Sequence, residues 1–173
     1  WQRLADLYGP VVYAWARRAN LQPNDAADVT QEVFQSVAKS IQRFEKRNAS
    51  DSFRGWLWTI TRNKVLDHIR RREGKEEVVG GTAAHQAMHE IESEPPSTDS
   101  ETGCSELTGV RERALLQIKK RTSEKIWTAF YRTAVLNDSP VDVAEDLGIT
   151  VWSVYKARSR VLKRLRDEFE NLI

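Results

Sequence analysis

The side chains best suited to bind another molecule lie in residues 140–165, which read PVDVAEDLGITVWSVYKARSRVLKRL. A helical projection of the second half places Val154, Ala157 and Val161 on one face and basic or hydroxyl side chains on the other. The outward set comprises Ser153, Lys156, Arg160, Lys163 and Arg164. Such groups hydrogen-bond to base edges and neutralise phosphates, so the chemistry they predict is non-covalent recognition of DNA.

The spacing in the same stretch predicts a helix-turn-helix. The small Ala144 lets two helices approach, Gly148 supplies the turn, and Val154 packs the second helix on the first. An ordinary amphipathic hairpin is the alternative, and the basic outer face favours DNA binding.

A second group with binding chemistry occupies residues 53–72, FRGWLWTITRNKVLDHIRRR. The apolar face rotates along this predicted helix, so we expect Phe53 and Trp56 in the core. Six polar side chains are expected to face outward: Asn63, Lys64, Asp67, His68, Arg70 and Arg71. Aromatic rings beside a basic helix suit single-stranded nucleic acid, because bases stack on rings while cations follow the backbone.

A third polar face is predicted on a helix that starts at Pro23-Asn24-Asp25. Its buried stripe is expected to comprise Val29, Val33, Val37 and Ile41, with Phe34 alongside. The polar residues recur at spacings of three and four: Asp28, Gln31, Glu32 and Gln35. This face either docks a partner or is simply solvated.

Charge divides the chain into parts. Residues 39–75 carry 11 basic and four acidic side chains, residues 76–106 carry eight acidic and no Lys or Arg, and residues 107–173 carry 13 basic and nine acidic. Two basic parts around an acidic connector favour a polyanionic partner met at two places. We therefore expect an all-α protein: two small helical domains, 1–73 and 107–173, joined by a flexible acidic linker, 74–106, with the helix-turn-helix in the C-terminal domain.

Within these domains, Gly9-Pro10 predicts a kink or break in a helix over residues 3–19. A second interruption is expected at residues 120–123, within a helical stretch over residues 107–136.

Several function classes are disfavoured. The chain has one cysteine and no apolar stretch near the roughly 20 residues that cross a bilayer, which predicts a cytoplasmic protein with no membrane insertion. His85 and His89, with Cys104 beyond them, have a spacing that could hold a metal, but no recognised metal or phosphate motif accompanies them. We expect no enzyme activity, no metal and no cofactor.

Three segments together resemble a bacterial sigma factor of the extracytoplasmic-function (ECF) type, over nearly the full length. DAADVTQEVF at residues 25–34 resembles the segment that holds the beta-prime clamp of RNA polymerase, and residues 53–72 resemble the promoter-melting and minus-ten segment. Residues 139–165 resemble the minus-thirty-five reader. The resemblance implies a factor that binds core RNA polymerase through the beta-prime clamp and the beta flap, recognises both promoter elements and promotes melting.

The resemblance also implies site residues. Polymerase binding falls on Asp28, Gln31, Glu32 and Gln35. Minus-ten DNA binding falls on Arg47, Asn48, Ala49, Ser50, Phe53, Trp58, Asn63, Lys64, Arg70 and Arg71. Minus-thirty-five DNA binding falls on Ser153, Tyr155, Lys156, Ser159, Arg160, Lys163 and Arg164.

The reader segment departs from the family pattern at two positions. Tyr155 stands where Lys or Arg is common, and Trp152 stands where a small residue is usual. Promoter DNA and core polymerase are the implied partners, and an anti-sigma factor is a further partner that the resemblance allows. The alternative function is a helix-turn-helix regulator that binds duplex DNA without core polymerase.

Overall fold

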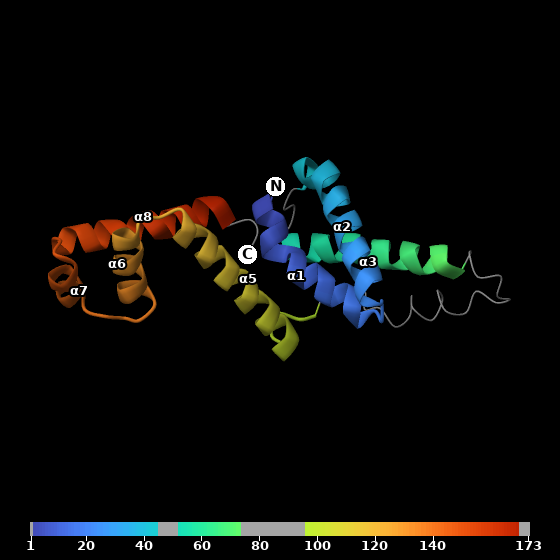
Figure 1. Ribbon diagram of the computed structural model, residues 1–173, viewed down its shortest axis with the longest axis horizontal. Helices are drawn as coiled ribbons and strands as arrows, with labels where there is room; N and C mark the ends of the chain where they lie inside the picture. Colours follow the sequence, from blue (N-terminus) through green and yellow to red (C-terminus); the bar gives the residue numbers. More distant parts are fainter. Residues whose placement is uncertain (1, 45–51, 74–95, 170–173) are drawn as a thin grey trace. The chain divides into compact units, whose positions relative to one another are not determined.

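The computed structural model describes residues 2–44, 52–73 and 96–169 (Figure 1). Every regular element in these ranges is a helix, which confirms the all-α prediction. The chain divides into two compact units between Val110 and Arg111.

The first unit is built on three helices that pack on one another: α1 (Gln2–Arg18), α2 (Pro23–Ser40) and α3 (Phe53–Glu73). A short 3₁₀ helix, η1 (Ile41–Arg43), follows α2. Each α-helix contributes aliphatic or aromatic side chains to one core, whose largest fully buried members are Tyr8, Trp15, Leu7, Leu57, Val12, Val29, Val33, Val37 and Val65. The valines of the stripe predicted for α2 are therefore buried as expected, whereas Ile41 is half-buried and lies in η1.

Helix α1 runs through Pro10 without interruption, so of the two predicted alternatives at Gly9-Pro10, a kink or a break, the break is wrong. Proline removes one backbone hydrogen bond and crowds the residue before it. Gly9 has no Cβ to meet the proline ring, and Pro10 is exposed, so the freed carbonyl of the preceding turn lies on the solvent side. Burial of Tyr8, Val11 and Val12 on the other side holds the helix together.

Helix α5 (Glu101–Lys120) includes the last six residues of the predicted acidic linker, which corrects the expectation that residues 101–106 are flexible. The Ser100 side chain accepts a hydrogen bond from the Gly103 backbone N–H at 3.1 Å and so caps the first turn. Gly103 is required there, because a Cβ would lie 2.0 Å from the Ser97 carbonyl oxygen.

The second unit contains α6 (Glu124–Ala134), α7 (Pro140–Leu147) and α8 (Val151–Phe169), which pack pairwise on one another. The interruption expected at residues 120–123 lies between α5 and α6. Asn137, which follows α6, has a φ of 61°, the left-handed conformation that Asn tolerates better than most residues.

No helix in the described ranges is both long and apolar enough to cross a membrane.

We predict that Pro10→Ala stabilises the first unit, since the substitution restores the backbone N–H and removes the ring clash in the interior of α1. The expected gain in the free energy of unfolding is about 1–3 kcal/mol in urea denaturation. Pro140→Ala is the matched control, because Pro140 occupies the first turn of α7, where its missing N–H costs nothing. A Pro10→Ala variant no more stable than the parent chain contradicts this account of α1.

Candidate nucleic-acid interface

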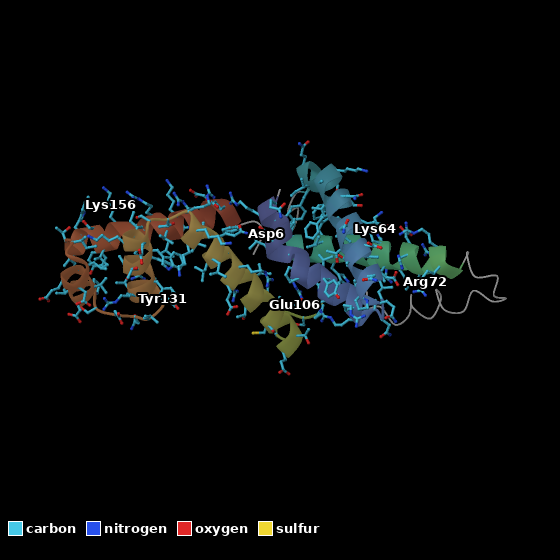
Figure 2. The ribbon with its side chains drawn as sticks, viewed as in Figure 1. Asp6, Lys64, Arg72, Glu106, Tyr131 and Lys156 are labelled. Carbon is cyan, nitrogen blue, oxygen red and sulfur yellow. The ribbon has the colours of Figure 1, made fainter. Side chains whose placement is uncertain are left out.

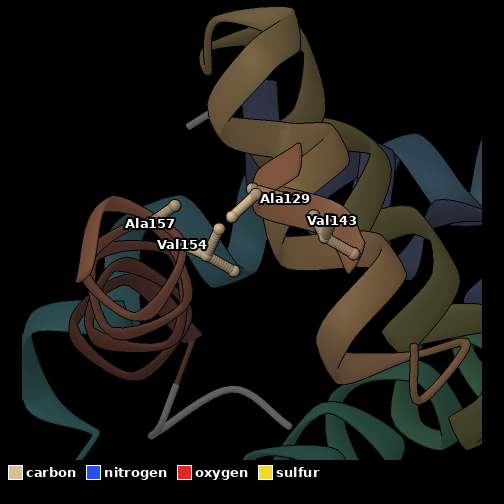
Figure 3. Close-up of a cluster of buried hydrophobic side chains, with 5 residues drawn as sticks. Ala129, Val143, Val154 and Ala157 are labelled. Carbon is tan, nitrogen blue, oxygen red and sulfur yellow. The ribbon is translucent and has the colours of Figure 1, made fainter. Parts of the chain in front are cut away.

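The second unit holds α8 in a fixed rotation through a small apolar core. Ala129 of α6, Val143 and Ala144 of α7, and Val154 and Ala157 of α8 form one buried cluster (Figure 3). Three of the five are alanines, so the helices approach closely. The packing determines which side of α8 remains outside.

The ends of α7 and the start of α8 are closed by local hydrogen bonds. The Ser139 Oγ accepts from the Val141 N–H at 3.3 Å, at the start of α7. Gly148 ends α7 with φ 59° and ψ 45°, and its N–H bonds to the Ala144 and Glu145 carbonyls. Thr150 Oγ1 accepts from the Ser153 N–H at 3.2 Å and so caps the first turn of α8.

Arg132 connects α6 to both the following loop and α7. Its Nε donates to Asp138 Oδ2 at 2.7 Å, and its Nη1 donates to Asp146 Oδ2 at 2.7 Å. The hydrogen bond to Asp138, followed by that to Asp146, raises the pKa of Arg132 above its ordinary value. The charged guanidinium therefore bonds to both carboxylates and helps to hold the α6–α7 connection.

Most of the α8 side chains predicted to read DNA are open to solvent. The exposed members are Tyr155, Lys156, Ser159, Arg160 and Lys163. Figure 2 shows Lys156 on the side of α8 that faces away from α6 and α7. From Val151 to Arg166 the helix carries six basic residues and no acidic one, so this face attracts polyanions.

Two of the predicted readers are engaged within the protein. The half-buried Ser153 places its hydroxyl 2.9 Å from Thr150 Oγ1, at the start of α8. The Arg164 Nη1 donates to the Arg121 carbonyl oxygen at 3.1 Å. In this structure both side chains support α8 rather than extend from it.

On the first unit, the polar face of α2 is only partly free. Asp28, Gln31 and Gln35 are exposed. Glu32 is half-buried and accepts two hydrogen bonds from Arg71 of α3, at 2.9 and 3.1 Å. Lys64 of α3 also approaches Glu32, at 4.0 Å. Through Glu32, the face of α2 expected to bind polymerase is thus in contact with the face of α3 expected to bind minus-ten DNA.

The C-terminal half of α3 is tied to α2 at a second point. Arg72 donates to Asp25 at 3.0 Å, and the His68 Nε2 lies 3.5 Å from the other oxygen of Asp25. A hollow of about 240 Å³ lies beside these ion pairs, lined by Asp28, Glu32, His68, Arg71 and Arg72. Asn63 and Arg70 remain exposed, and Arg70 lies 3.3 Å from Asp67 on its own helix.

The aromatic side chains of α3 correct part of the predicted minus-ten set. Phe53 is 2% exposed and Trp58 is 8% exposed. The Phe53 ring packs edge-on against Tyr8 at 5.2 Å between centroids, and the Trp58 ring packs edge-on against Trp15 at 5.0 Å. Neither ring is open to a base, so both belong to the core under α3. The other expected members of this part, Arg47, Asn48, Ala49 and Ser50, lie outside the described residues.

Sequence reasoning missed a buried ion cluster in the first unit. Arg54 of α3 donates to Glu106 of α5 and to the Pro96 carbonyl oxygen, the latter at 2.8 Å. The Glu106 carboxylate also accepts from Trp15 Nε1, at 3.0 Å, and from Arg18. The side chains of Arg54 and Glu106 are 8% and 9% exposed. The available signal in the sequence was an arginine in the aromatic-rich stretch Phe53-Arg54-Gly55-Trp56, but the partner of Arg54 lies 52 residues further along.

In the part of the chain that the structure describes, no three His, Cys, Asp or Glu side chains come together as a metal site. Cys104 is exposed, and His85 and His89 lie outside the described residues.

Comparison with known proteins gives the first unit its class. Residues 4–74 match the sigma-70 region 2 family. The ECF RNA polymerase sigma factor SigE of Mycolicibacterium smegmatis is 39% identical over 72 residues, which cover 42% of this chain and 26% of that protein. The ECF RNA polymerase sigma factor SigW of Bacillus subtilis is 23% identical over 176 residues, covering 95% of this chain and 88% of SigW. A probable RNA polymerase sigma factor of Haemophilus influenzae is 35% identical over 57 residues, covering 31% and 28% of the two chains.

The α1–α3 body is therefore a sigma-70 region 2 domain, and the match to SigE spans about a quarter of that relative's length. The chain is thus similar to sigma factors of the ECF group, the family that its sequence motifs resemble.

We predict that Glu106→Ala destabilises the first unit by about 3 kcal/mol, because it leaves the Arg54 guanidinium buried without its carboxylate. The measurement is urea denaturation of the full chain, with Glu112→Ala as control, since Glu112 is an exposed carboxylate on the same helix. A double-mutant cycle with Arg54→Ala isolates the pair. Equal effects of Glu106→Ala and Glu112→Ala would contradict a stabilising role for the cluster.

Proposed function

We propose that this chain is a promoter-specificity factor that binds core RNA polymerase, recognises the minus-thirty-five and minus-ten elements, and promotes melting of promoter DNA. The observation that carries the proposal is the match of α1–α3 to sigma-70 region 2. The acid-free basic face of α8 in the second unit supports the duplex-reading half of the task. A protein with this role acts where polymerase and DNA are, in the cytoplasm.

The proposed division assigns residues 1–73 to polymerase docking and melting, 74–106 to a linker, and 107–173 to minus-thirty-five recognition. The folded turn at residues 101–106, which packs on Arg54, shortens the segment that can act as a free linker. In this proposal the second unit also contacts the beta flap.

Docking to the beta-prime clamp is assigned to the α2 face. Three of its polar side chains, Asp28, Gln31 and Gln35, are exposed and so are free to form hydrogen bonds across an interface. Glu32 is positioned by Arg71 and presents less of its surface. The valine stripe behind this face holds it rigidly against α1 and α3, which lowers the ordering cost of association.

Melting is assigned to the loop before α3 and to the outward side of that helix. Trapping an unstacked base offsets a few kcal/mol of the cost of opening a base pair. Arg47, Asn48, Ala49 and Ser50 are proposed to hold such a base, while Asn63, Lys64, Arg70 and Arg71 contact the strands. Phe53 and Trp58 are buried on the inner side of α3 and pack that helix against α1. Each of these tasks is binding, so the proposal needs no catalytic residue.

Minus-thirty-five recognition is assigned to the exposed face of α8. Residues near the N-terminus of a recognition helix contact base edges, and cations further along the helix contact phosphates. Tyr155, Lys156 and Ser159 fit the first role, and Arg160 and Lys163 fit the second. Ser153 and Arg164 contribute chiefly by holding α8.

Co-purification with core RNA polymerase, followed by transcription in vitro from a pool of genomic promoters, tests the proposal. We expect the chain to join the polymerase and to direct initiation at a subset of promoters. Binding to duplex DNA with no affinity for polymerase would instead favour the helix-turn-helix regulator.

We predict that Gln31→Ala combined with Gln35→Ala weakens binding to core polymerase about tenfold, because two interface hydrogen bonds are lost. The dissociation constant is measured with fluorescently labelled chain. Gln42→Ala is the control, since Gln42 is exposed and lies beyond α2. If the double variant binds like the control, the docking face lies elsewhere.

We predict that Lys163→Ala lowers the salt dependence of duplex binding by the polymerase complex. Removing one phosphate contact reduces the slope of log K against log salt concentration by about 0.9. Lys125→Ala removes an exposed charge from α6 and serves as control. A slope that falls equally in both variants would show that net charge matters and the face of α8 does not.

A further inference from the structure

The assigned reader residues leave out the most exposed large apolar side chain of the described part of the chain. Trp152 is 67% exposed and lies in the first turn of α8. Single exposed apolar residues are common and need no function. The position and the neighbours of Trp152 are what distinguish it.

Trp152 lies in line with the proposed DNA-binding residues. Trp152, Lys156, Ser159 and Lys163 are spaced four, three and four residues apart, which places them on one side of the helix. The opposite side carries the buried Val154, Ala157 and Val161. The indole is therefore near the middle of the outward face, at the end of the helix that approaches base edges most closely.

The indole is also held in place. The Lys156 Nζ lies 4.4 Å from the centroid of the Trp152 ring, within the range of a cation–π contact. The capped first turn, closed by Thr150 and Ser153, fixes the backbone beneath it. An ordered ring loses little conformational entropy when it binds.

The surroundings favour nucleic acid over protein as the partner of this ring. All charged side chains from Val151 to Arg166 are basic, so a partner that covers the ring must tolerate several cations around it. Phosphates on both sides of a groove meet that requirement.

The chemistry of the indole then indicates which group in the DNA major groove Trp152 recognises. Indole carries one donor and no acceptor, and most of its surface is apolar. The apolar feature that the major groove displays is the C5-methyl group of thymine. We infer that Trp152 is a specificity-determining residue that packs against a thymine methyl group in the duplex bound by α8. This inference rests on the proposed function, that α8 enters the major groove of promoter DNA.

The test uses the full chain assembled with core RNA polymerase. Bound duplexes are selected from a library randomised over the upstream element, and each thymine of the best duplex is then replaced singly by deoxyuridine, which lacks only the methyl group. For the parent chain we expect about fourfold weaker binding at one or two adjacent positions, the value of one buried methyl group. For Trp152→Ala we expect equal binding of thymine and deoxyuridine there.

Val141→Ala is the matched control, because Val141 is 57% exposed but lies on α7. It should keep the fourfold difference, and thermal unfolding should show all three chains equally folded. No thymine preference in the parent chain, or an undiminished preference in Trp152→Ala, overturns the inference while the proposed function stands. Failure of the parent complex to select any duplex overturns the proposed function and this inference with it.

Discussion

The rotation of α8 about its own axis is the constraint on which the second unit depends. Val154 and Ala157 enter a core made of alanine and valine side chains from α6 and α7, and Val161 continues the stripe. Side chains this small allow one close packing and few alternatives. Because the apolar stripe is fixed, Lys156, Arg160 and Lys163 lie on the exposed part of α8. Arg132 and the Gly148 turn then hold the two preceding helices in place behind it.

The first unit is held together differently. Its three helices share an aliphatic and aromatic core, and a buried Arg54–Glu106 pair ties the start of α5 to that core. Removing one half of such a pair leaves a buried charge without water or partner, so the pair stabilises the unit and also determines where the start of α5 lies. The composition of residues 101–106 suggested a solvated linker, but the Glu106 carboxylate makes this stretch part of the first unit.

Periodicity made most of the helices predictable. The valines of α2 and the stripe of α8 recur at helical spacing, and burial of one face settles their structure. The start of α5 was not predictable in this way, because the residues around it are acidic and small and their stabilising partner is distant in sequence. The continuity of α1 at Pro10 was not predictable for a related reason. The low helix propensity of proline favours a break there, but the tertiary packing of Tyr8 and Val12 outweighs it.

In the candidate sites too, the exposed faces were predictable from the sequence and the contacts between distant residues were not. The sequence indicated which side chains lie on a face, as for Asp28 and Gln31 on α2 or Lys156 and Lys163 on α8. It did not show that Glu32 bonds to Arg71, 39 residues away, or that the Trp58 ring packs edge-on against Trp15. Periodicity identifies which side chains share a surface. The tertiary structure determines which of those side chains already bond within the protein.

The pairing of Glu32 with Arg71 and of Asp25 with Arg72 has an energetic consequence. A phosphate that approaches either arginine meets a guanidinium that is already paired with a carboxylate. The binding free energy of the phosphate is therefore reduced by the free energy of the ion pair that it breaks. A protein surface that engages Glu32 in place of Arg71 releases that guanidinium for the nucleic acid. By thermodynamic reciprocity, the nucleic acid then favours the protein surface to the same extent. In the proposed role, α2 and α3 would thus make strand capture and attachment to polymerase mutually reinforcing.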